Sequence, residues 1–313
     1  MSDKRSPHIS IVSPVYYGEV LVQPLVERIV AAMESFTSDF EIILVDDGSP
    51  DASWRAIELT AGEDKRIKGI KLSRNFGQHY ALTAGLEAAN GDWVVVLDCD
   101  LQDRPEEIPN LYREAVQSGY DLVFARRNLR QDSWSRRLAS NLFYKAFSFM
   151  TDTEQDASVA NFGIYRRNVV EAVLPMGDSV RFFPTMSQWV GFERGYLDVR
   201  HAARESGEST YNFRRLLRLA TENIVAFSNK PLKLTIKLGS SISVVSFLIA
   251  LYYLIKYLTG GIVVLGYTSL ILSIWFIGGM IIALLGMVGL YVGYTFERVK
   301  QRPVYIVSER RNF

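Results

Sequence analysis

Cysteine is almost absent from the 313-residue chain, which contains only Cys99. A single cysteine excludes a disulfide within the chain and leaves no Cys/His cluster for a structural zinc site. An excess of positive charge is absent too, because 35 lysines and arginines balance 34 aspartates and glutamates to a net charge of +1. We therefore expect no nucleic-acid partner, and the cysteine content fits a reducing compartment.

Charged residues are scarce between residues 238 and 296, where Lys256 is the one strongly charged side chain. Two nearly uncharged runs occupy residues 238–255 and 267–294. At a rise of about 1.5 Å per residue, each run is long enough for a helix to cross a hydrocarbon core of about 30 Å. The sequence thus predicts two transmembrane helices, over about residues 236–257 and 267–294.

Basic residues flank both predicted spans, and residues 257–266 between the spans carry no charge. The positive-inside rule then places both chain ends and residues 1–210 in the cytoplasm. Apolar residues at helical spacing, with arginines on the opposite side, predict an amphipathic helix on the membrane surface over residues 211–234. The alternative is a helix packed on the preceding domain with a solvated basic face. The flanking basic residues are Lys230, Lys233, Lys237, Arg298, Lys300 and Arg302.

Residues 1–210 alternate between two patterns. Helical spacing occurs at residues 20–36, after Ser49 and at residues 80–89. The alternation predicts an α/β domain with a doubly wound, mostly parallel, Rossmann-like sheet, whose ligands lie beyond the carboxyl ends of the strands. The polar clusters after the strands should therefore line one cleft. The apolar, β-branched runs typical of buried parallel strands are residues 9–15, 41–45, 69–72, 93–97 and 122–125.

Two acids, Asp98 and Asp100, directly follow the apolar run at residues 93–97. Side chains two residues apart in an extended segment point the same way, so both carboxylates can meet one divalent cation while Cys99 points to the other side. Magnesium prefers a few carboxylates together with diphosphate oxygens and water. An isolated pair would more often form a cap and a turn, but the position at the end of a core strand favours a metal site. Cys99 is interpreted as a small packing residue.

Several short strings, taken in order, resemble one known family. They are similar to the GT-A glycosyltransferases of family 2 and, within it, to the polyprenyl-phosphate hexose transferases, which include bactoprenol glucosyltransferases and dolichol-phosphate mannose synthases. The resemblance implies a GT-A fold for the cytoplasmic domain. The strings are Val-Ser-Pro-Val-Tyr at 12–16, Val-Asp-Asp-Gly-Ser at 45–49, Arg-Asn-Phe-Gly at 74–77, Asp-Cys-Asp-Leu-Gln-Asp at 98–103, Phe-Ser at 227–228 with Pro-Leu at 231–232, and Arg-Pro at 302–303.

The resemblance also implies roles for residues of the donor site. Asp98, Asp100 and Gln102 would hold Mg²⁺ or Mn²⁺ against the diphosphate of the donor, so Asp98 also counts as a donor-binding residue. Arg204 lies where relatives have a flexible loop that closes over the diphosphate. Residues 46–49 can in addition form a turn and a helix cap after the second strand. The nucleotide-base end of the pocket would contain Pro14, Tyr16, Glu19, Asp46 and Asp47, with Asp46 accepting a hydrogen bond from a pyrimidine ring.

A dense group of arginines follows the apolar run at residues 122–125. Arginine matches phosphate oxygens with two parallel hydrogen bonds, which suits the phosphate of a lipid acceptor. A solvated basic loop, or general attraction to anionic lipid head groups, is the alternative. By family position, Arg126 with Arg136 or Arg137 are the candidate catalytic arginines. The group consists of Arg126, Arg127, Arg130, Arg136 and Arg137.

The chain departs from the family pattern in two places. Relatives often have Asp-Phe-Arg where this chain has Asn161, Phe162 and Gly163, so an acid and an arginine near the acceptor are missing. Either Asp156 replaces that acid, or an acceptor that arrives deprotonated does not need it. Relatives commonly have a lysine at the position of Thr210, which puts one donor-phosphate contact in doubt.

We expect an inverting, metal-dependent glycosyltransferase that moves a sugar from a nucleotide-sugar to polyprenyl (undecaprenyl) phosphate, with a UDP-sugar favoured over a GDP-sugar. Alternatives are a catalytically inactive scaffold of a glycosylation complex and a processive polysaccharide synthase, which is disfavoured by the small number of spans. The resemblance implies a bacterial inner-membrane protein that forms a homo-oligomer, with a tetramer expected. The expected parts are a catalytic domain at 1–210, the amphipathic region at 211–234, the two spans at 235–296 and a cytoplasmic tail at 297–313.

Overall fold

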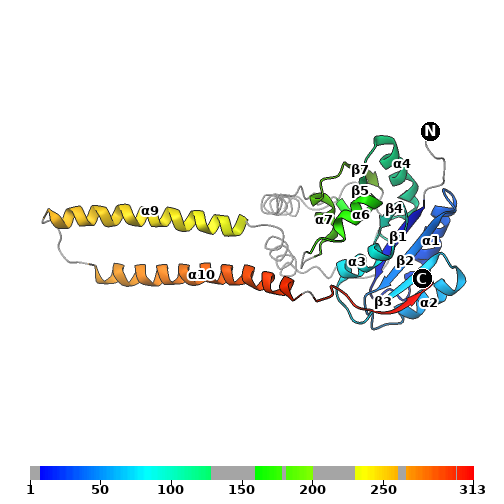
Figure 1. The fold of residues 1–313 in the computed structure, drawn as a ribbon, viewed down its shortest axis with the longest axis horizontal. Coiled ribbons are helices and arrows are strands. Elements are labelled where there is room, and N and C mark those ends of the chain that lie inside the picture. The colour runs from blue at the N-terminus through cyan, green and yellow to red at the C-terminus, as the bar shows by residue number, and fades with distance from the viewer. Residues whose placement is uncertain (1–7, 128–158, 178–180, 200–229, 260–265, 301) are drawn as a thin grey trace. The chain divides into compact units, whose positions relative to one another are not determined.

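The computed structural model describes most of the chain (Figure 1). It divides into two compact units, one containing the sheet and the chain's C-terminal end, the other containing two long helices. The described residues are 8–127, 159–177, 181–199, 230–259, 266–300 and 302–313.

The described strands of the first unit form one sheet in the order β7-β5-β6-β4-β1-β2-β3-β8. Its centre is parallel, because β1 pairs in parallel with both β2 and β4, and β2 pairs in parallel with β3. The predicted α/β sheet is therefore confirmed, with strand bounds close to those expected. The strands are β1 (Ile9–Val15), β2 (Phe40–Asp46), β3 (Ile67–Leu72), β4 (Trp93–Val96), β5 (Leu122–Arg127), β6 (Val159–Arg166), β7 (Arg194–Val199) and β8 (Val307–Arg311).

The sheet also contains strands that the sequence did not predict. β6 runs antiparallel between β4 and β5, so the strand at Leu122–Arg127 does not pair with β4 directly. β7 pairs in parallel with β5, and β8 runs antiparallel along β3. These additions make the sheet mixed rather than uniformly parallel, while its carboxyl-terminal edge at β1 to β4 is as expected.

Helices cover both faces of the sheet (Figure 1). One face carries the main buried core, in which Leu25, Ile57 and Leu111 of three helices join Ile11 and Ile42 of the strands. On the other face, α3 approaches the sheet closely: a Cβ added at Gly85 would lie 2.3 Å from a methyl carbon of Val12. The helices are α1 (Val22–Glu34), α2 (Ser53–Glu63), α3 (Gln78–Ala88), the 3₁₀ helix η1 (Pro105–Glu107), α4 (Ile108–Ser118), α6 (Arg167–Val173) and α7 (Phe183–Trp189).

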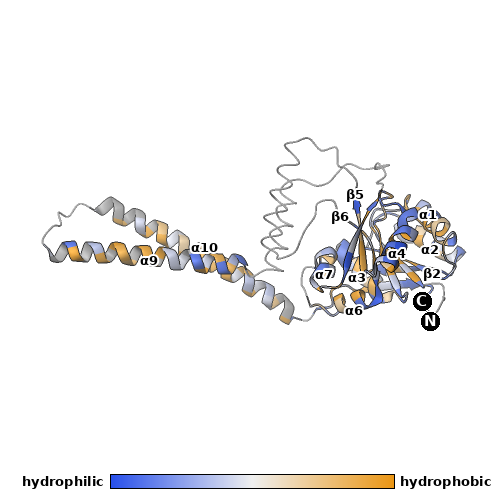
Figure 2. Cartoon of the chain, turned by 90° about the horizontal axis from the view of Figure 1, so that it is seen from above, coloured by the Kyte–Doolittle hydropathy of each residue, from blue (hydrophilic) through white to orange (hydrophobic). Residues whose placement is uncertain are grey.

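The second unit contains α9 (Lys230–Leu258) and α10 (Tyr267–Val299). Both are long and apolar enough to cross a membrane, and hydrophobic residues run along both (Figure 2). The two predicted spans are thus present as helices, each somewhat longer than expected. Most of the predicted amphipathic segment, residues 211–229, lies outside the described residues, and residues 230–234 belong to α9.

The C-terminal segment returns to the sheet domain instead of ending as a simple tail. β8 extends the sheet beyond β3, where Lys71 forms an ion pair of 2.9 Å with Glu309. Asn312 donates through Nδ2 to the carbonyl oxygens of Ala61 and Ile67, at 2.6 and 2.7 Å. The hydroxyl of Tyr305 also donates to Glu87 on α3, so the last residues of the chain are fixed to α2, β3 and α3.

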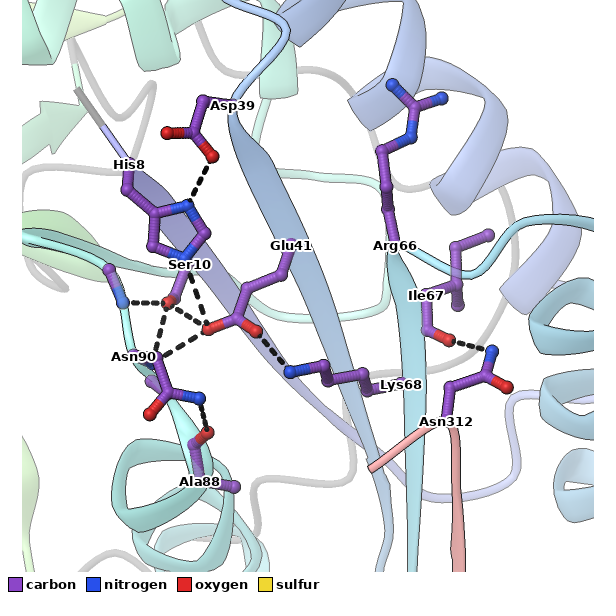
Figure 3. Close-up of polar contacts among 12 residues, drawn as sticks. His8, Ser10, Asp39, Glu41, Arg66, Ile67, Lys68, Ala88, Asn90 and Asn312 are labelled. Atoms are coloured by element: carbon purple, nitrogen blue, oxygen red, sulfur yellow. Dashed lines mark hydrogen bonds and ion pairs between the residues drawn. The ribbon is translucent and has the colours of Figure 1, made fainter. Parts of the chain in front are cut away.

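A buried polar cluster lies at the amino ends of the strands, opposite the edge expected to bind ligand (Figure 3). Glu41 of β2, 5% exposed, accepts hydrogen bonds from the Ser10 hydroxyl and from the Asn90 backbone N–H, at 2.5 and 2.7 Å. Lys68 of β3 donates to the other carboxylate oxygen at 2.6 Å. Burial alone raises the pKa of Glu41, but these donors outweigh it and lower the pKa below its ordinary value. The cluster therefore joins β1, β2, β3 and the end of α3 through one ionised side chain.

Candidate active site

The loops that follow β1, β2, β3 and β4 meet at one edge of the sheet. The backbone N–H of Tyr17 lies 3.3 Å from the hydroxyl of Ser49, which links the loop after β1 to the loop after β2. The loop after β2 is bonded in turn to the loop after β3, through Asp47, and the first residue of α3, Gln78, is bonded to Asp98 after β4. This meeting of polar loops at the carboxyl ends of parallel strands was predicted from the sequence, and the hydrogen bonds confirm it.

Asp46 and Asp47 are adjacent but differ in what their carboxylates contact. Asp46 is fully buried; its Oδ1 accepts the Ser49 N–H at 3.2 Å, and its Oδ2 accepts no hydrogen bond from any described residue. Burial raises the pKa of Asp46, although hydrogen bonds from Ser49 oppose the rise. A buried oxygen without a donor is costly, and a ligand N–H would satisfy it. Asp46 therefore has the acceptor that the predicted base contact requires.

Asp47 instead binds the loop after β3. Its two oxygens accept the backbone N–H groups of Phe76 and Gly77, both at 2.8 Å. Burial raises the pKa of Asp47, and these two donors act against it. The adjacent Gly48 has a φ of +63°, and a Cβ there would lie 2.3 Å from the Arg74 carbonyl carbon, so only glycine fits. Asp47 thus positions the loop after β3. The turn considered for residues 46–49 is present through the bond from the Ser49 N–H to Asp46, but these residues do not cap the next helix, because α2 begins only at Ser53.

The segment after β1 presents aromatic and acidic side chains at the same edge. Pro14 is buried within β1, whereas Tyr16 is 44% exposed. Glu19 is fixed to the loop after β2, since its N–H donates to Asp51 at 3.3 Å and its Oε2 accepts the Ala52 N–H at 3.4 Å. Tyr17, which the sequence analysis did not single out, has a φ of +55° and packs edge-on against the Tyr16 ring. A left-handed conformation in a non-glycine residue is strained and is frequent at functional sites.

Asp98 and Asp100 follow β4, as predicted, and both are half-buried. Asp98 accepts a hydrogen bond from the Gln78 side chain at 2.7 Å, and Asp100 accepts the Gln102 backbone N–H at 3.1 Å. Leu101, between Asp100 and Gln102, has a φ of +60°, so the chain turns sharply within the predicted metal-binding string. Cys99 packs against the core, and burial raises the pKa of its thiol to about 12, which fits the packing role.

The residues present suit a hard divalent cation. Among the described residues, His, Cys, Asp and Glu side chains do not gather in threes or more, so these side chains do not form a complete metal site by themselves. The side-chain oxygens of Asp98, Asp100 and Gln102 form an all-oxygen set with few carboxylates, which is the set that Mg²⁺ and Mn²⁺ accept when phosphate oxygens and water complete the shell. The donor set therefore fits the expected ion, with the remaining ligands to come from outside the chain.

The predicted acceptor arginines are only partly within the described residues. Arg126 lies at the end of β5, where its Nε donates to Asp198 of β7 at 2.6 Å, and this hydrogen bond lowers the pKa of Asp198. Arg127 is described in its backbone alone, as the last residue of β5. Which arginine side chains bind the phosphate of the acceptor therefore stays a prediction. The residues outside the described part are Arg130, Arg136, Arg137, Asp156, Arg204 and Thr210.

Asn161 and Gly163, which form one of the two departures from the family pattern, lie on β6. Asn161 points its amide towards Asp98, with Nδ2 3.4 Å from Oδ2. A Cβ at Gly163 would lie 2.9 Å from the Val123 carbonyl oxygen and 3.1 Å from the Tyr165 hydroxyl, so a larger residue would have to displace its neighbours. Sequence reasoning flagged Asn161 only as a missing acid and did not consider Gln78, whose position directly after the Arg-Asn-Phe-Gly string was the available signal.

The comparison with protein families agrees with this geometry. The model of the family "Glycosyl transferase family 2" matches residues 10–174, more than half of the chain. The chain belongs to glycosyl transferase family 2. The resemblance predicted from the short strings is thereby confirmed.

Curated family 2 relatives align with this glycosyltransferase over nearly its whole length. An uncharacterised glycosyltransferase of Synechocystis sp. is 35% identical, covering 96% of this chain and 95% of its own. Proteins named undecaprenyl-phosphate 4-deoxy-4-formamido-L-arabinose transferase are 36% identical in Proteus mirabilis, covering 96% of this chain and 93% of the relative, and 37% identical in Shewanella sediminis, covering 96% and 92%. The match therefore includes the two long helices.

Solved structures of other glycosyltransferases share the fold of the sheet domain. The mannosyltransferase PcManGT of Pyrobaculum calidifontis, in complex with GDP-Man and Mn²⁺, superposes with a TM-score of 0.52 at 17% identity, covering 74% of this chain and 65% of its own. Glucosyl-3-phosphoglycerate synthase of Mycobacterium tuberculosis, in complex with Mn²⁺, UDP and phosphoglyceric acid, gives 0.50 at 15% identity, covering 70% and 77%. At such low identity these likenesses support the GT-A type of fold alone.

Proposed function

We propose that this family 2 glycosyltransferase moves a sugar from a nucleotide-sugar to undecaprenyl phosphate, inverting the configuration at the anomeric carbon. The observation that carries the proposal is the arrangement at one edge of the sheet, where the buried acceptor oxygen of Asp46 and the acids after β4 belong to one hydrogen-bonded set of loops. Relatives aligned over 96% of the chain carry undecaprenyl phosphate in their names, which supports this acceptor.

The nucleotide of the donor is assigned to the loops after β1 and β2. Oδ2 of Asp46 would accept an N–H from the base, and the exposed ring of Tyr16 is available to pack against the nucleoside. Pro14 and Glu19 shape this end of the site. Asp47 takes part by holding the loop after β3 through two N–H donors, rather than by contacting the base. A UDP-sugar is favoured over a GDP-sugar because Asp46 offers a single acceptor, the group that pairs with the imide N–H of uracil.

Asp98, Asp100 and Gln102 are assigned to Mg²⁺ or Mn²⁺ bound with the donor diphosphate. When bound, such a cation supplies positive charge that stabilises the departing nucleoside diphosphate. The acceptor needs no strong base from the protein, because a phosphate monoester with a second pKa of about 6 is mostly dianionic at neutral pH. The chain's own residues thus have to orient the two substrates and to offset the repulsion between their negatively charged phosphate groups.

Arginines after β5 are assigned to the phosphate of the lipid. Arg126 and Arg127 end β5, which lies between β6 and β7 in the sheet, and Arg136 and Arg137 come after it in sequence. The Arg126–Asp198 ion pair holds one guanidinium at this end of the strand. Phosphate binding at Arg126 would add to that ion pair or replace it. Arg204 would close over the donor diphosphate.

The helices α9 and α10 would keep the enzyme in the membrane that contains its lipid substrate. In this proposal both spans cross a bacterial inner membrane, and the catalytic domain and both chain ends are cytoplasmic. Assembly as a tetramer stays part of the same proposal.

Transfer of a radiolabelled sugar to undecaprenyl phosphate in detergent tests the proposal. The donors would be a panel of UDP- and GDP-sugars, together with a nucleotide-linked 4-deoxy-4-formamido-L-arabinose, with Mg²⁺ or Mn²⁺ and with chelator. We expect a labelled lipid that chelator abolishes, and its complete loss in Asp100→Ala, whose carboxylate is assigned to the cation. Full activity of that variant would refute the metal assignment, and no labelled lipid from any donor would favour the inactive scaffold.

A further inference from the structure

Asp98 is held by amide side chains on both of its oxygens. Nε2 of Gln78 lies 2.7 Å from Oδ1, and Nδ2 of Asn161 lies 3.4 Å from Oδ2. The two amides come from different parts of the fold, Gln78 from the first position of α3 and Asn161 from β6. Two neighbours distant in sequence thus converge on one carboxylate of the predicted metal site.

The fold sets the backbone position of each of these two residues. Gly77, which precedes Gln78, has a φ of +112° and donates its N–H to Asp47 at 2.8 Å, so the start of α3 is bonded to the turn after β2. On the other side, Val96 of β4 pairs with Gly163 of β6, and the antiparallel register then brings Asn161 across from Asp98. The backbone positions of both donor residues therefore depend on the start of α3 and on the strand register, while the Gln78 side chain is exposed and that of Asn161 is half-buried.

We infer that Gln78 and Asn161 are positioning residues that orient the Asp98 carboxylate for the divalent cation; this inference rests on the proposed function. An ionised carboxylate has about four lone-pair sites, so two amide donors do not prevent it from binding a cation. Amides are suited to this task because they carry no charge. An arginine or lysine in either place would hold Asp98 equally well, but would repel the cation.

The same contacts could instead serve only to join α3 and β6 to the end of β4. A purely structural role and a positioning role differ in whether loss of the contact changes the affinity for the metal ion. Loss of a structural tie changes stability, whereas loss of a hydrogen bond that orients a metal ligand lowers metal affinity, typically by about 10- to 100-fold. Affinity for Mn²⁺, measured without turnover, therefore separates the two.

The experiment is a titration of the full-length protein in detergent with Mn²⁺, following the electron paramagnetic resonance signal of the free ion, in the presence of UDP or GDP. In Gln78→Met, which keeps the side-chain length and removes the donor, we expect the Kd for Mn²⁺ to rise by about 10- to 100-fold. Gln23→Met is the matched control, because Gln23 donates to Glu27 at 3.0 Å on the exposed surface of α1. Its Kd should stay within about twofold of the unchanged protein, the scale of an ordinary surface substitution.

Asn161→Ala gives a second test that does not depend on the folding of the first variant. Its contact is longer, so we expect a rise in the Kd for Mn²⁺ at the lower end of the same range. Asn168→Ala is its control, since Asn168 makes an amide contact of the same 3.4 Å length with Asp121, an acid outside the predicted metal set. The melting temperature of each variant identifies any that is not folded.

The outcomes distinguish this inference from the proposed function. If the unchanged protein transfers sugar but Gln78→Met and Asn161→Ala bind Mn²⁺ as it does, the positioning role is wrong and the proposed function stands. If the unchanged protein binds no Mn²⁺ with either nucleotide, the inference and the metal assignment both fail. Weaker Mn²⁺ binding in a folded variant, with both controls unchanged, supports the inference even where the sugar donor is still unidentified.

Discussion

Replacing Glu41 by glutamine removes one negative charge from the buried cluster of Figure 3 while preserving the shape of the side chain. A glutamine can still accept from Ser10 and Asn90, but its amide group faces the Lys68 ammonium, which donates to Glu41 at 2.6 Å. A hydrogen bond between charged groups contributes about 1.5–3 kcal/mol, and breaking a buried ion pair by removing one partner costs about 3–5 kcal/mol. Because Lys68 is 20% exposed and partly regains water, we expect a loss near the lower figures, about 2–3 kcal/mol.

Thermal unfolding of the purified protein in detergent measures this loss. For a domain of 150–250 residues, 1 kcal/mol corresponds to a shift of about 2–4 °C in Tm, so Glu41→Gln should lower Tm by about 4–12 °C. Glu106→Gln is the matched control: Glu106 pairs with Arg28 through two hydrogen bonds of 3.0 Å, but 44% of its side chain is exposed. Exposed pairs contribute at most about 1 kcal/mol, so its shift should be much smaller.

The pH dependence of the difference gives the second half of the test. The folded pKa of Glu41 is lowered, so the stabilisation by its ionised form is complete above the unfolded value of about 4.3 and is lost as the pH falls through the folded pKa. The Tm difference between the unchanged protein and Glu41→Gln should therefore be constant near neutral pH and shrink in acid. Equal Tm shifts in Glu41→Gln and Glu106→Gln, or a difference independent of pH down to the acid limit, would refute the reasoning.

Two further predictions concern the site and the C-terminal strand. Asp46→Asn should weaken the binding of UDP, measured by calorimetry, by about 10- to 100-fold, because the uracil N–H loses a charged acceptor. Burial raises the pKa of Asp46, so the UDP affinity of the unchanged protein should also decline as the pH falls through that raised pKa. An unchanged UDP affinity in Asp46→Asn would contradict the base contact. Asn312→Ala removes two hydrogen bonds worth about 0.5–1.5 kcal/mol each and puts alanine at a φ of +61°, so backbone amides of Val307–Arg311 should exchange with deuterium faster. Unaltered exchange there would mean that the strand pairing alone holds the segment.

Local sequence patterns predicted the centre of the fold well. The apolar runs at residues 9–15 and 93–97 became β1 and β4, and the helical spacing at residues 80–89 became α3, within two residues at each end. These elements were predictable because side-chain periodicity and β-branching act within a few neighbouring residues. The acids after β4 were found for the same reason, since strand end and acid pair are adjacent in sequence.

The strands that complete the sheet could not be read in the same way. β6 enters between β4 and β5 although it follows β5 in sequence, and β8 pairs with β3 from the far end of the chain, beyond both long helices. β8 reads Val-Ser-Glu-Arg-Arg and is mostly exposed, so it lacks the apolar run that identifies a buried strand. Its place depends on pairing with the edge of β3 and on Asn312 and Lys71, contacts that exist only after the sheet has formed.

The family, the succession of the central strands and helices along the chain, the acids at the strand ends and the two apolar segments could all be read from the sequence, because each is encoded in a short, contiguous pattern. What each polar side chain contacts depends instead on the folded chain. Asp46 and Asp47 are neighbours in one string, yet one carboxylate has a buried oxygen that accepts no hydrogen bond from any described residue, and the other binds two N–H groups of the next loop. Gln78 and Asn161 meet on Asp98 from α3 and β6, because strand order and register, rather than proximity in sequence, determine which hydrogen-bonding groups face one another.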